Sequence, residues 1–289
     1  MRETGGSEGP WCLSGLHFSM ASVSEEGWEL GREGFVGVFD SGVGGISVLR
    51  ALTAELPHED FHFFGDSANA PYGEKSVEEV RALVAHIADG MLADGAKAIV
   101  IACNTATSTS AALLRAEHPD VPIIGVEPAL KPAVEAARPG AVLVMATPVT
   151  LRLEKFQELE RHVAGESDVR VLCAPCPGLA SRIEQGHLDE PDVTDLLQGL
   201  VGGYRGEVGS VVLGCTHYPF VRRQVAKVLG LPDEAFFDGA AGTARQCRRM
   251  LEAAGLLADE GRSGTVSLGS SRNTAEELEL YRRFLALPL

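Results

Sequence analysis

The sequence is short of basic residues. Lysine and arginine together number 25 against 40 aspartate and glutamate residues, which gives a net charge of −15 over 289 residues. A protein surface that binds nucleic acid needs clustered lysine and arginine side chains, so this balance argues against a nucleic-acid partner. It does not argue against a small anionic substrate, because such a substrate needs only a local group of hydrogen-bond donors.

Long apolar runs are absent as well. No run approaches the ~18 residues that a membrane span needs, so we expect no membrane partner. Cysteine is sparse, with 6 residues at irregular spacing, a usage that argues against a disulfide framework and predicts free thiols in a cytoplasmic protein. Cys173 and Cys176 form a single C-x-x-C pair, whereas a structural zinc site would require a second pair.

The first 33 residues differ from the rest of the chain. They are rich in glycine, serine and glutamate, and they lack both sustained periodicity and the basic start and apolar centre of a secretory signal. We expect residues 1–33 to be a disordered N-terminal extension. The chain length favours two domains in the remainder, at about 150 residues per domain.

From residue 34 onwards, short apolar runs alternate with segments of helical periodicity. Strands are predicted at 34–39, 61–64, 98–102, 121–126, 141–146, 169–173, 210–213, 235–237 and 265–268. Helices are predicted at 46–56, 76–94, 129–137, 150–162, 192–204, 220–229, 241–254 and 274–285, with a further helix that Pro177 opens and that carries Glu184. Alternation of this kind predicts an α/β fold with mainly parallel sheets and helices on both faces.

Two of these strands deliver a cysteine at their carboxyl ends. One leads into Cys103 and the other into Cys215, 215 − 103 = 112 residues later. Ligands bind at this edge of an open α/β sheet, and a following helix start favours a thiolate. A single buried cysteine is usually a packing residue. The matched pair instead predicts acid and base groups on opposite faces of one small molecule, as in a racemisation or epimerisation.

Polar residues follow the same strand ends. His217 is either a packed imidazole or a partner that tunes Cys215. Asp40 is either a turn residue or a group that orients Cys103 or a substrate ammonium. The remaining hydroxyl and amide residues can be helix caps, or they can bind a carboxylate and an ammonium through neutral hydrogen bonds; they are Ser41, Asn104, Thr105, Thr147 and Thr216.

Neither a cofactor nor a metal is expected. Pyridoxal phosphate requires a Schiff-base lysine, and no lysine follows a core strand as the cysteines do; the lysines are Lys75, Lys97, Lys131, Lys155 and Lys227. The glycine-rich turn at 42–45 lies between a strand and a helix, where backbone N–H groups can hold an anion. It lacks the lysine of a phosphate loop and the full dinucleotide fingerprint.

Four segments resemble, in order, the motifs of bacterial glutamate racemases: 37–45, 65–76, 102–106 and 213–219. The similarity extends from about Phe35 to the C-terminal helix. It implies the fold of the cofactor-independent aspartate/glutamate racemase superfamily, in which two flavodoxin-like domains face a central cleft. It also implies a discontinuous first domain, 34–126 with 238–289, that flanks a second domain at 127–237.

The resemblance further implies roles for individual residues. Cys103 would act on the D-isomer side with help from Asp40, and Cys215 on the L-isomer side with help from His217, with Glu184 as an additional acid. Substrate contacts would come from Asp40, Ser41, Tyr72, Gly73, Asn104, Thr105, Thr147, Thr216 and His217. The implied activity is interconversion of L- and D-glutamate, which supplies D-glutamate for peptidoglycan and so for cell-wall biogenesis and cell shape. The expected assembly is a homodimer.

Several alternatives stay open at this point. Another activity of the superfamily, such as an aspartate or hydantoin racemase, would use the same two thiols, whereas a decarboxylase would lack one of them. A binding protein that holds an anion at residues 42–45 would catalyse nothing. A hydrolase that used Cys215 and His217 would leave Cys103 without a role.

Overall fold

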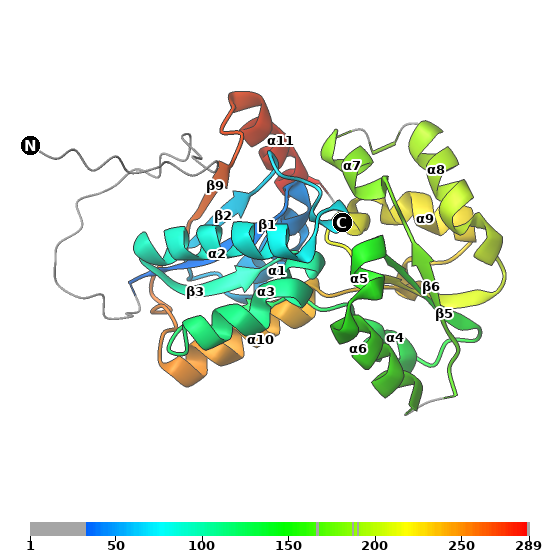
Figure 1. Cartoon of the computed structure of the whole chain (residues 1–289), viewed down its shortest axis with the longest axis horizontal. Helices are drawn as coiled ribbons and strands as arrows, with labels where there is room; N and C mark the ends of the chain where they lie inside the picture. The colour runs from blue at the N-terminus through cyan, green and yellow to red at the C-terminus, as the bar shows by residue number, and fades with distance from the viewer. Residues whose placement is uncertain (1–32, 166–167, 187, 190, 288–289) are drawn as a thin grey trace, which may run out of the picture.

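The structure, a computed structural model, describes residues 33–165, 168–186, 188–189 and 191–287. The predicted extension at 1–33 lies outside these residues except for Glu33. Among the described residues, no helix is long and apolar enough to cross a membrane. Figure 1 shows two α/β units side by side, each with one sheet and its own helices.

The strands are β1 (Phe35–Asp40), β2 (Phe61–Gly65), β3 (Ala96–Ile101), β4 (Ile123–Gly125), β5 (Ala141–Ala146), β6 (Val171–Pro175), β7 (Val208–Leu213), β8 (Phe236–Asp238) and β9 (Val266–Ser270). The helices are α1 (Ile46–Glu55), α2 (Val77–Ala93), α3 (Asn104–Glu117), α4 (Leu130–Glu135), α5 (Pro148–Arg152), α6 (Glu154–Gly165), α7 (Leu179–Glu184), α8 (Pro191–Val201), α9 (Arg222–Leu229), α10 (Ala240–Ala254) and α11 (Ala275–Ala286).

The first sheet has the order β4-β3-β1-β2-β9, and all its strand pairs are parallel. Every residue of β1 and β3 is buried, because helices cover both faces of a parallel sheet. Side chains alternate between the faces: Val36 and Val38 join the core that includes α1 and α10 residues, whereas Phe35 and Phe39 join the core of α2 and α3. We call this sheet and helices α1, α2, α3, α10 and α11 the first lobe.

The second sheet has the order β6-β5-β7-β8, again all parallel. With helices α4 to α9 it forms the second lobe. Read by position in the chain, its strands follow the order second, first, third, fourth, and β2-β1-β3-β4 of the first sheet follows the same order. This is the order of flavodoxin-like sheets, in which the strand order reverses beside the first strand. The two lobes therefore repeat one architecture.

Three predicted elements differ from the structure. The strand expected at 169–173 is β6 at Val171–Pro175, an edge strand that tolerates Pro175 because proline cannot donate to a central ladder. The helix expected at 150–162 is two helices, α5 and α6, because Leu153 has extended dihedral angles. The helix expected from Phe220 begins as a 3₁₀ turn, Tyr218–Val221, and only then becomes α9.

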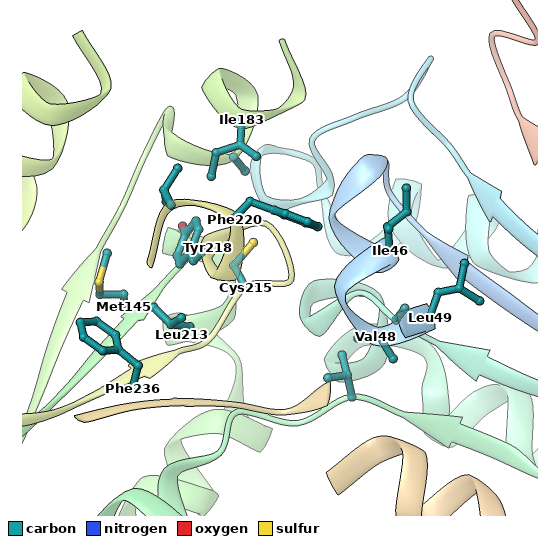
Figure 2. Packing of buried hydrophobic residues seen from close by; sticks show 14 of the residues in the cluster. Ile46, Val48, Leu49, Met145, Ile183, Leu213, Cys215, Tyr218, Phe220 and Phe236 are labelled. Carbon is teal, nitrogen blue, oxygen red and sulfur yellow. The ribbon is translucent and has the colours of Figure 1, made fainter. Parts of the chain in front are cut away.

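The chain passes between the lobes twice, after β4 and after β8. The last segment, β9 and α11, returns to the first lobe, where β9 pairs with β2 (Figure 1). A single apolar core extends from the first lobe into the second. Figure 2 shows part of it, with Ile46, Val48 and Leu49 on one side and Leu213, Tyr218 and Phe220 around Cys215 on the other. This continuous core fixes how the two sheet edges face each other.

Candidate active site

The carboxyl ends of four strands meet between the lobes. Asp40 ends β1 and Cys103 follows β3, the two strands between which the order of the first sheet reverses. Thr147 and Cys215 lie just beyond β5 and β7, the equivalent strands of the second sheet. Ligands of open α/β sheets bind at such switch points. Here two switch points face one cavity, lined by Ser41, Pro71, Tyr72, Gly73, Cys103, Asn104, Thr105, Thr147, Thr150, Ala180, Gly214, Cys215, Thr216 and His217.

Cys103 is held at the start of α3. It is the N-cap of that helix, and the Ala106 N–H donates to its Sγ at 3.5 Å. The Sγ lies 3.8 Å from the Ser41 hydroxyl oxygen. Burial raises the pKa of the Cys103 thiol, and the charge of the nearby Asp40 carboxylate raises it further, whereas the Ala106 N–H lowers it. The arrangement favours a protonated thiol at Cys103 in the absence of substrate.

Asp40 is fully buried beside Cys103. Its Oδ1 accepts hydrogen bonds from the Ser41 hydroxyl and the Gly42 N–H, both at 3.0 Å. Its Oδ2 accepts one from the Thr216 hydroxyl at 2.7 Å, a contact that crosses from the second lobe. Burial raises the pKa of the Asp40 carboxyl, while the charge of His217 and the Thr216 and Ser41 hydroxyls oppose that rise. Asp40 therefore orients the groups around Cys103 and joins the two lobes.

Cys215 belongs to a hydrogen-bonded series of three side chains. Its Sγ lies 3.6 Å from Nδ1 of His217, and Nε2 of His217 lies 2.5 Å from Oε1 of Glu184. Burial lowers the pKa of His217, but the hydrogen bonds to Cys215 and Glu184 and the charge of Glu184 outweigh burial and raise that pKa well above its ordinary value. A protonated imidazole beside Cys215 stabilises a thiolate there. The two thiols thus occupy opposite electrostatic environments.

The glycine-rich turn after β1 makes room for this series. A Cβ on Gly44 would lie 2.3 Å from Nδ1 of His217, and a Cβ on Gly42 would lie 1.9 Å from Oε1 of Glu184. The Val43 N–H of the same turn donates to Oε1 of Glu184 at 2.8 Å. The backbone donor that a bound anion would use is therefore already engaged by a side chain of the second lobe.

Hydroxyl groups from both lobes form another wall of the cavity. Thr147 caps α5, and its Oγ1 lies 2.9 Å from Oγ1 of Thr150 and 3.4 Å from Oγ1 of Thr105. Thr150 is fully buried and lines the cavity. The sequence analysis missed Thr150; its spacing of three residues from the helix cap, which places both hydroxyls on one face of a helix start, is the signal that could have found it.

Tyr72 lines the cavity, but its hydroxyl points to another partner. The hydroxyl donates to Oδ2 of Asp66 at 2.6 Å, so a ligand would meet the ring or the backbone of Tyr72. Gly73 packs against Thr147, since a Cβ at Gly73 would lie 2.9 Å from the Thr147 Cβ. The cavity is narrow as a result, with about 20 Å³ for the centres of water-sized molecules. A substrate enters only if the lobes separate slightly and then close around it.

The structure brings the predicted site residues to this one place. Asp40 and Glu184 stand behind the cavity wall and act through Ser41, Thr216 and His217, while the other predicted residues line the cavity itself. Cys173 and Cys176 are free thiols that contact Glu160 and the Ala174 carbonyl. Within the described part of the chain, no group of three or more His, Cys, Asp or Glu side chains is placed to hold a metal ion. The catalytic and binding roles of these residues stay predictions.

The fold and the site together define a class: a two-lobed α/β protein with one thiol from each lobe in a shared cavity. Comparison with known proteins agrees. The family model described as Asp/Glu/Hydantoin racemase matches residues 43–247. A glutamate racemase of Clostridium novyi (strain NT) is 46% identical over 244 residues, which are 84% of this chain and 93% of that protein.

Solved structures give the same result. The glutamate racemase of Francisella tularensis subsp. tularensis SCHU S4 in complex with D-glutamate matches with a TM-score of 0.76 and 25% identity, over 89% of this chain and 95% of that chain. The Escherichia coli glutamate racemase in complex with L-glutamate and the activator UDP-MurNAc-ala matches with a TM-score of 0.73 and 30% identity, over 87% and 95% of the two chains. These matches confirm the predicted α/β fold of two flavodoxin-like units.

The chain belongs to the Asp/Glu/hydantoin racemase family and is an amino-acid racemase.

Proposed function

We propose that the protein is a cofactor-independent glutamate racemase that interconverts L- and D-glutamate with Cys103 and Cys215 as its acid and base. One observation carries the proposal: two buried thiols, one from each lobe, line a single narrow cavity. The choice of glutamate is supported by the names of the similar proteins and by the D- and L-glutamate complexes of two of them.

In the L-to-D direction the Cys215 thiolate removes the α-proton of L-glutamate. The electron pair of the broken C–H bond remains on the α-carbon, and the Cys103 thiol then donates its proton to the opposite face. The product is D-glutamate, with Cys215 now a thiol and Cys103 a thiolate. The D-to-L direction runs the same two transfers in reverse, and each cycle consumes neither cofactor nor oxidant.

The surroundings of the two thiols favour the L-to-D starting state. Cys103 is buried beside the Asp40 carboxylate, which keeps it protonated, whereas Cys215 lies against His217, whose raised pKa keeps the imidazole cationic. Glu184 supports that cation through Nε2 of His217. We assign Asp40 and Glu184 as positioning residues for the thiol and the imidazole.

The carbanion formed between the two transfers is stabilised by neutral donors rather than by a cofactor. The candidate donors are Ser41, Asn104, Thr105, Thr147, Thr216 and the backbone at Tyr72 and Gly73. In a cavity this narrow few waters compete, so each such hydrogen bond is stronger than in bulk water. Asn104 has a buried Oδ1 without a hydrogen-bond partner, which suits an acceptor for the substrate ammonium.

The wider setting follows from the activity. D-Glutamate supplied in this way would serve peptidoglycan synthesis in the cytoplasm, which accords with the free thiols among the described cysteines. We also propose that the lobes correspond to the domains expected from the sequence, 34–126 with 238–289 and 127–237. A homodimer remains our expectation, to be measured by light scattering at several protein concentrations.

Two alternatives are less well supported. A binding protein that held an anion at residues 42–45 would need the Val43 N–H, which donates to Glu184. A hydrolase that used Cys215 and His217 would leave Cys103 and its hydrogen bond to the Ala106 N–H without purpose. An aspartate racemase would have the same thiols, so the substrate itself must decide.

Circular dichroism of the amino acid in solution tests the proposal. The protein is incubated separately with L-glutamate, D-glutamate, L-aspartate and D-aspartate. We expect the ellipticity of both glutamate isomers to decay to zero and that of aspartate to decay far more slowly. Decay with aspartate alone would move the assignment to an aspartate racemase, and no decay with any of the four would contradict the proposed activity.

A further inference from the structure

The loop that follows β2 is buried although it contains little regular structure. It extends from Gly65 to the 3₁₀ turn Tyr72–Glu74, and it supplies Tyr72 and Gly73 to the cavity. Asp66 and Ser67, at its start, are among the least exposed polar residues of the described chain. A buried polar side chain is costly unless it is hydrogen-bonded, so the partners of these two residues indicate what holds the loop in place.

Asp66 is the centre of the loop. Its backbone N–H donates to the carbonyl of Asp40 at 2.9 Å, which fastens the loop to the end of β1. Its carboxylate accepts from the Tyr72 hydroxyl at 2.6 Å and from Nδ2 of Asn69 at 2.9 and 3.1 Å. The orientation of the Tyr72 ring in the cavity therefore depends on where Asp66 lies.

The neighbouring Ser67 is held from the far end of the chain. Its hydroxyl shares a hydrogen bond of 2.7 Å with the hydroxyl of Tyr281, a residue of α11 that is fully buried. The ring of Tyr281 packs edge-on against Phe63 with centroids 5.6 Å apart. A Cβ on Gly65 would lie 2.0 Å from the Tyr281 hydroxyl oxygen, so the glycine is what admits this hydroxyl beneath the loop.

The same helix contacts the second lobe near its catalytic series. Phe284, one turn after Tyr281, packs edge-on against Phe220 with centroids 4.6 Å apart. Phe220 lies three residues after His217. A Cβ on Gly186, two residues after Glu184, would meet Cδ1 of Leu280 at 2.7 Å. Helix α11 thus lies against the substrate loop of the first lobe and against the segments of the second lobe that hold Glu184 and His217.

We propose that Tyr281 is a positioning residue for substrate binding, which acts through Ser67 and Asp66 to set the place of Tyr72 and Gly73 in the cavity. The inference rests on the proposed function. Tyr281 does not line the cavity, so its hydroxyl acts on the loop and not on the substrate. The reacting thiols are held by α3 and by the segment after β7, not by this loop, so the proton transfers themselves keep their geometry when the Tyr281 hydroxyl is removed.

The test is Tyr281→Phe in the full chain, which keeps the ring and deletes only the hydroxyl. We expect KM for both glutamate isomers to rise about 3- to 10-fold, the range set by the loss of one hydrogen bond, while kcat stays within about 2-fold and the pH profile of kcat does not move. Ser67→Ala deletes the other half of the bond and should raise KM by a similar factor. The double variant should be no worse than either single variant, because both remove one interaction.

Tyr204→Phe is the matched control, since Tyr204 lies at the end of α8, away from the cavity, and its KM should equal that of the wild type. An unchanged KM in Tyr281→Phe and Ser67→Ala would overturn the inference and leave the racemase assignment intact. Equal losses in kcat and KM together with a lowered melting temperature would assign Tyr281 to folding alone. A wild-type protein without activity on either isomer would instead refute the proposed function on which the inference rests.

Discussion

At the scale of single residues, the site depends on two thiols placed in contrasting surroundings. Cys103 has a carboxylate near it and a raised pKa, and Cys215 has an imidazole 3.6 Å away that is itself held by Glu184. Such contrast gives an acid and a base from one residue type. It also makes the pH dependence of the reaction a direct report on His217.

Glu184→Gln removes the negative charge that helps to raise the pKa of His217. The imidazole should lose its proton at lower pH, so the alkaline limb of kcat/KM in the L-to-D direction should move to lower pH, with a loss of about 10²-fold at alkaline pH. Glu279→Gln, the same change at an exposed side chain of α11, is the control. A profile unchanged by Glu184→Gln would contradict the assignment of Glu184.

How far the sequence predicts the site can be judged from particular residues. Cys103, Cys215 and the residues beside them were predictable, because each follows a buried strand and the ends of parallel strands meet at one edge. Thr150, Asp66 and Tyr281 were not, because their placement depends on contacts between segments far apart in the chain. The hydrogen bond between Ser67 and Tyr281 joins residues 214 positions apart, and no local pattern contains that information.

At the scale of elements, the turn between β1 and α1 is the part that fits the two lobes together. Its residues Gly42 and Gly44 lie against Glu184 and His217, and Ser47 at the start of α1 donates to the carbonyl of Thr216 at 2.9 Å. The glycine-rich motif therefore serves close approach of the second lobe. Sequence alone left this turn open between an anion site and a tight bend.

Gly44→Ala tests that role of the turn. The added methyl would overlap the His217 ring, so the ring must leave Cys215 and kcat/KM should fall by at least about 10-fold, as expected for a disturbed acid–base group. Gly199→Ala, at a helical glycine of α8 with open space around it, should keep full activity and gain up to about 1 kcal/mol of stability. Steady-state kinetics and urea denaturation measure both effects. Full activity in Gly44→Ala would contradict the proposed contact.

At the scale of the whole molecule, the two lobes repeat one strand order and meet at their carboxyl edges. The fold class followed from the alternation of apolar strands with helices, whereas the boundaries of β6, α5 and α6 did not, because an edge strand and a break at Leu153 are set by their neighbours. Stability comes from both lobes and from the amino-terminal ends of the strands, far from the site. Lys97 and Glu59 form an ion pair there, 2.6 Å long and 1% exposed on either side.

Lys97→Met should separate stability from activity. It leaves the Glu59 carboxylate buried without its partner cation, a change that costs about 3–5 kcal/mol of unfolding free energy. KM for glutamate should not change, because Lys97 begins the strand that Cys103 follows at its other end. Lys131→Met, at an exposed pair with Glu135, should cost no more than about 1 kcal/mol. A loss as small as that of Lys131→Met in urea denaturation would contradict this view of the ion pair.

The central claim is that the two sulfurs act on opposite faces of the same carbon. The most direct measurement is deuterium exchange at the α-carbon in deuterated water, followed by NMR, with L- and D-glutamate and the variants Cys103→Ser and Cys215→Ser. We predict that each variant loses at least about 10²–10⁴-fold in racemisation, that Cys103→Ser exchanges only the L-isomer, and that Cys215→Ser exchanges only the D-isomer. Near-wild-type racemisation by either variant, or exchange of the same isomer by both, would contradict the account.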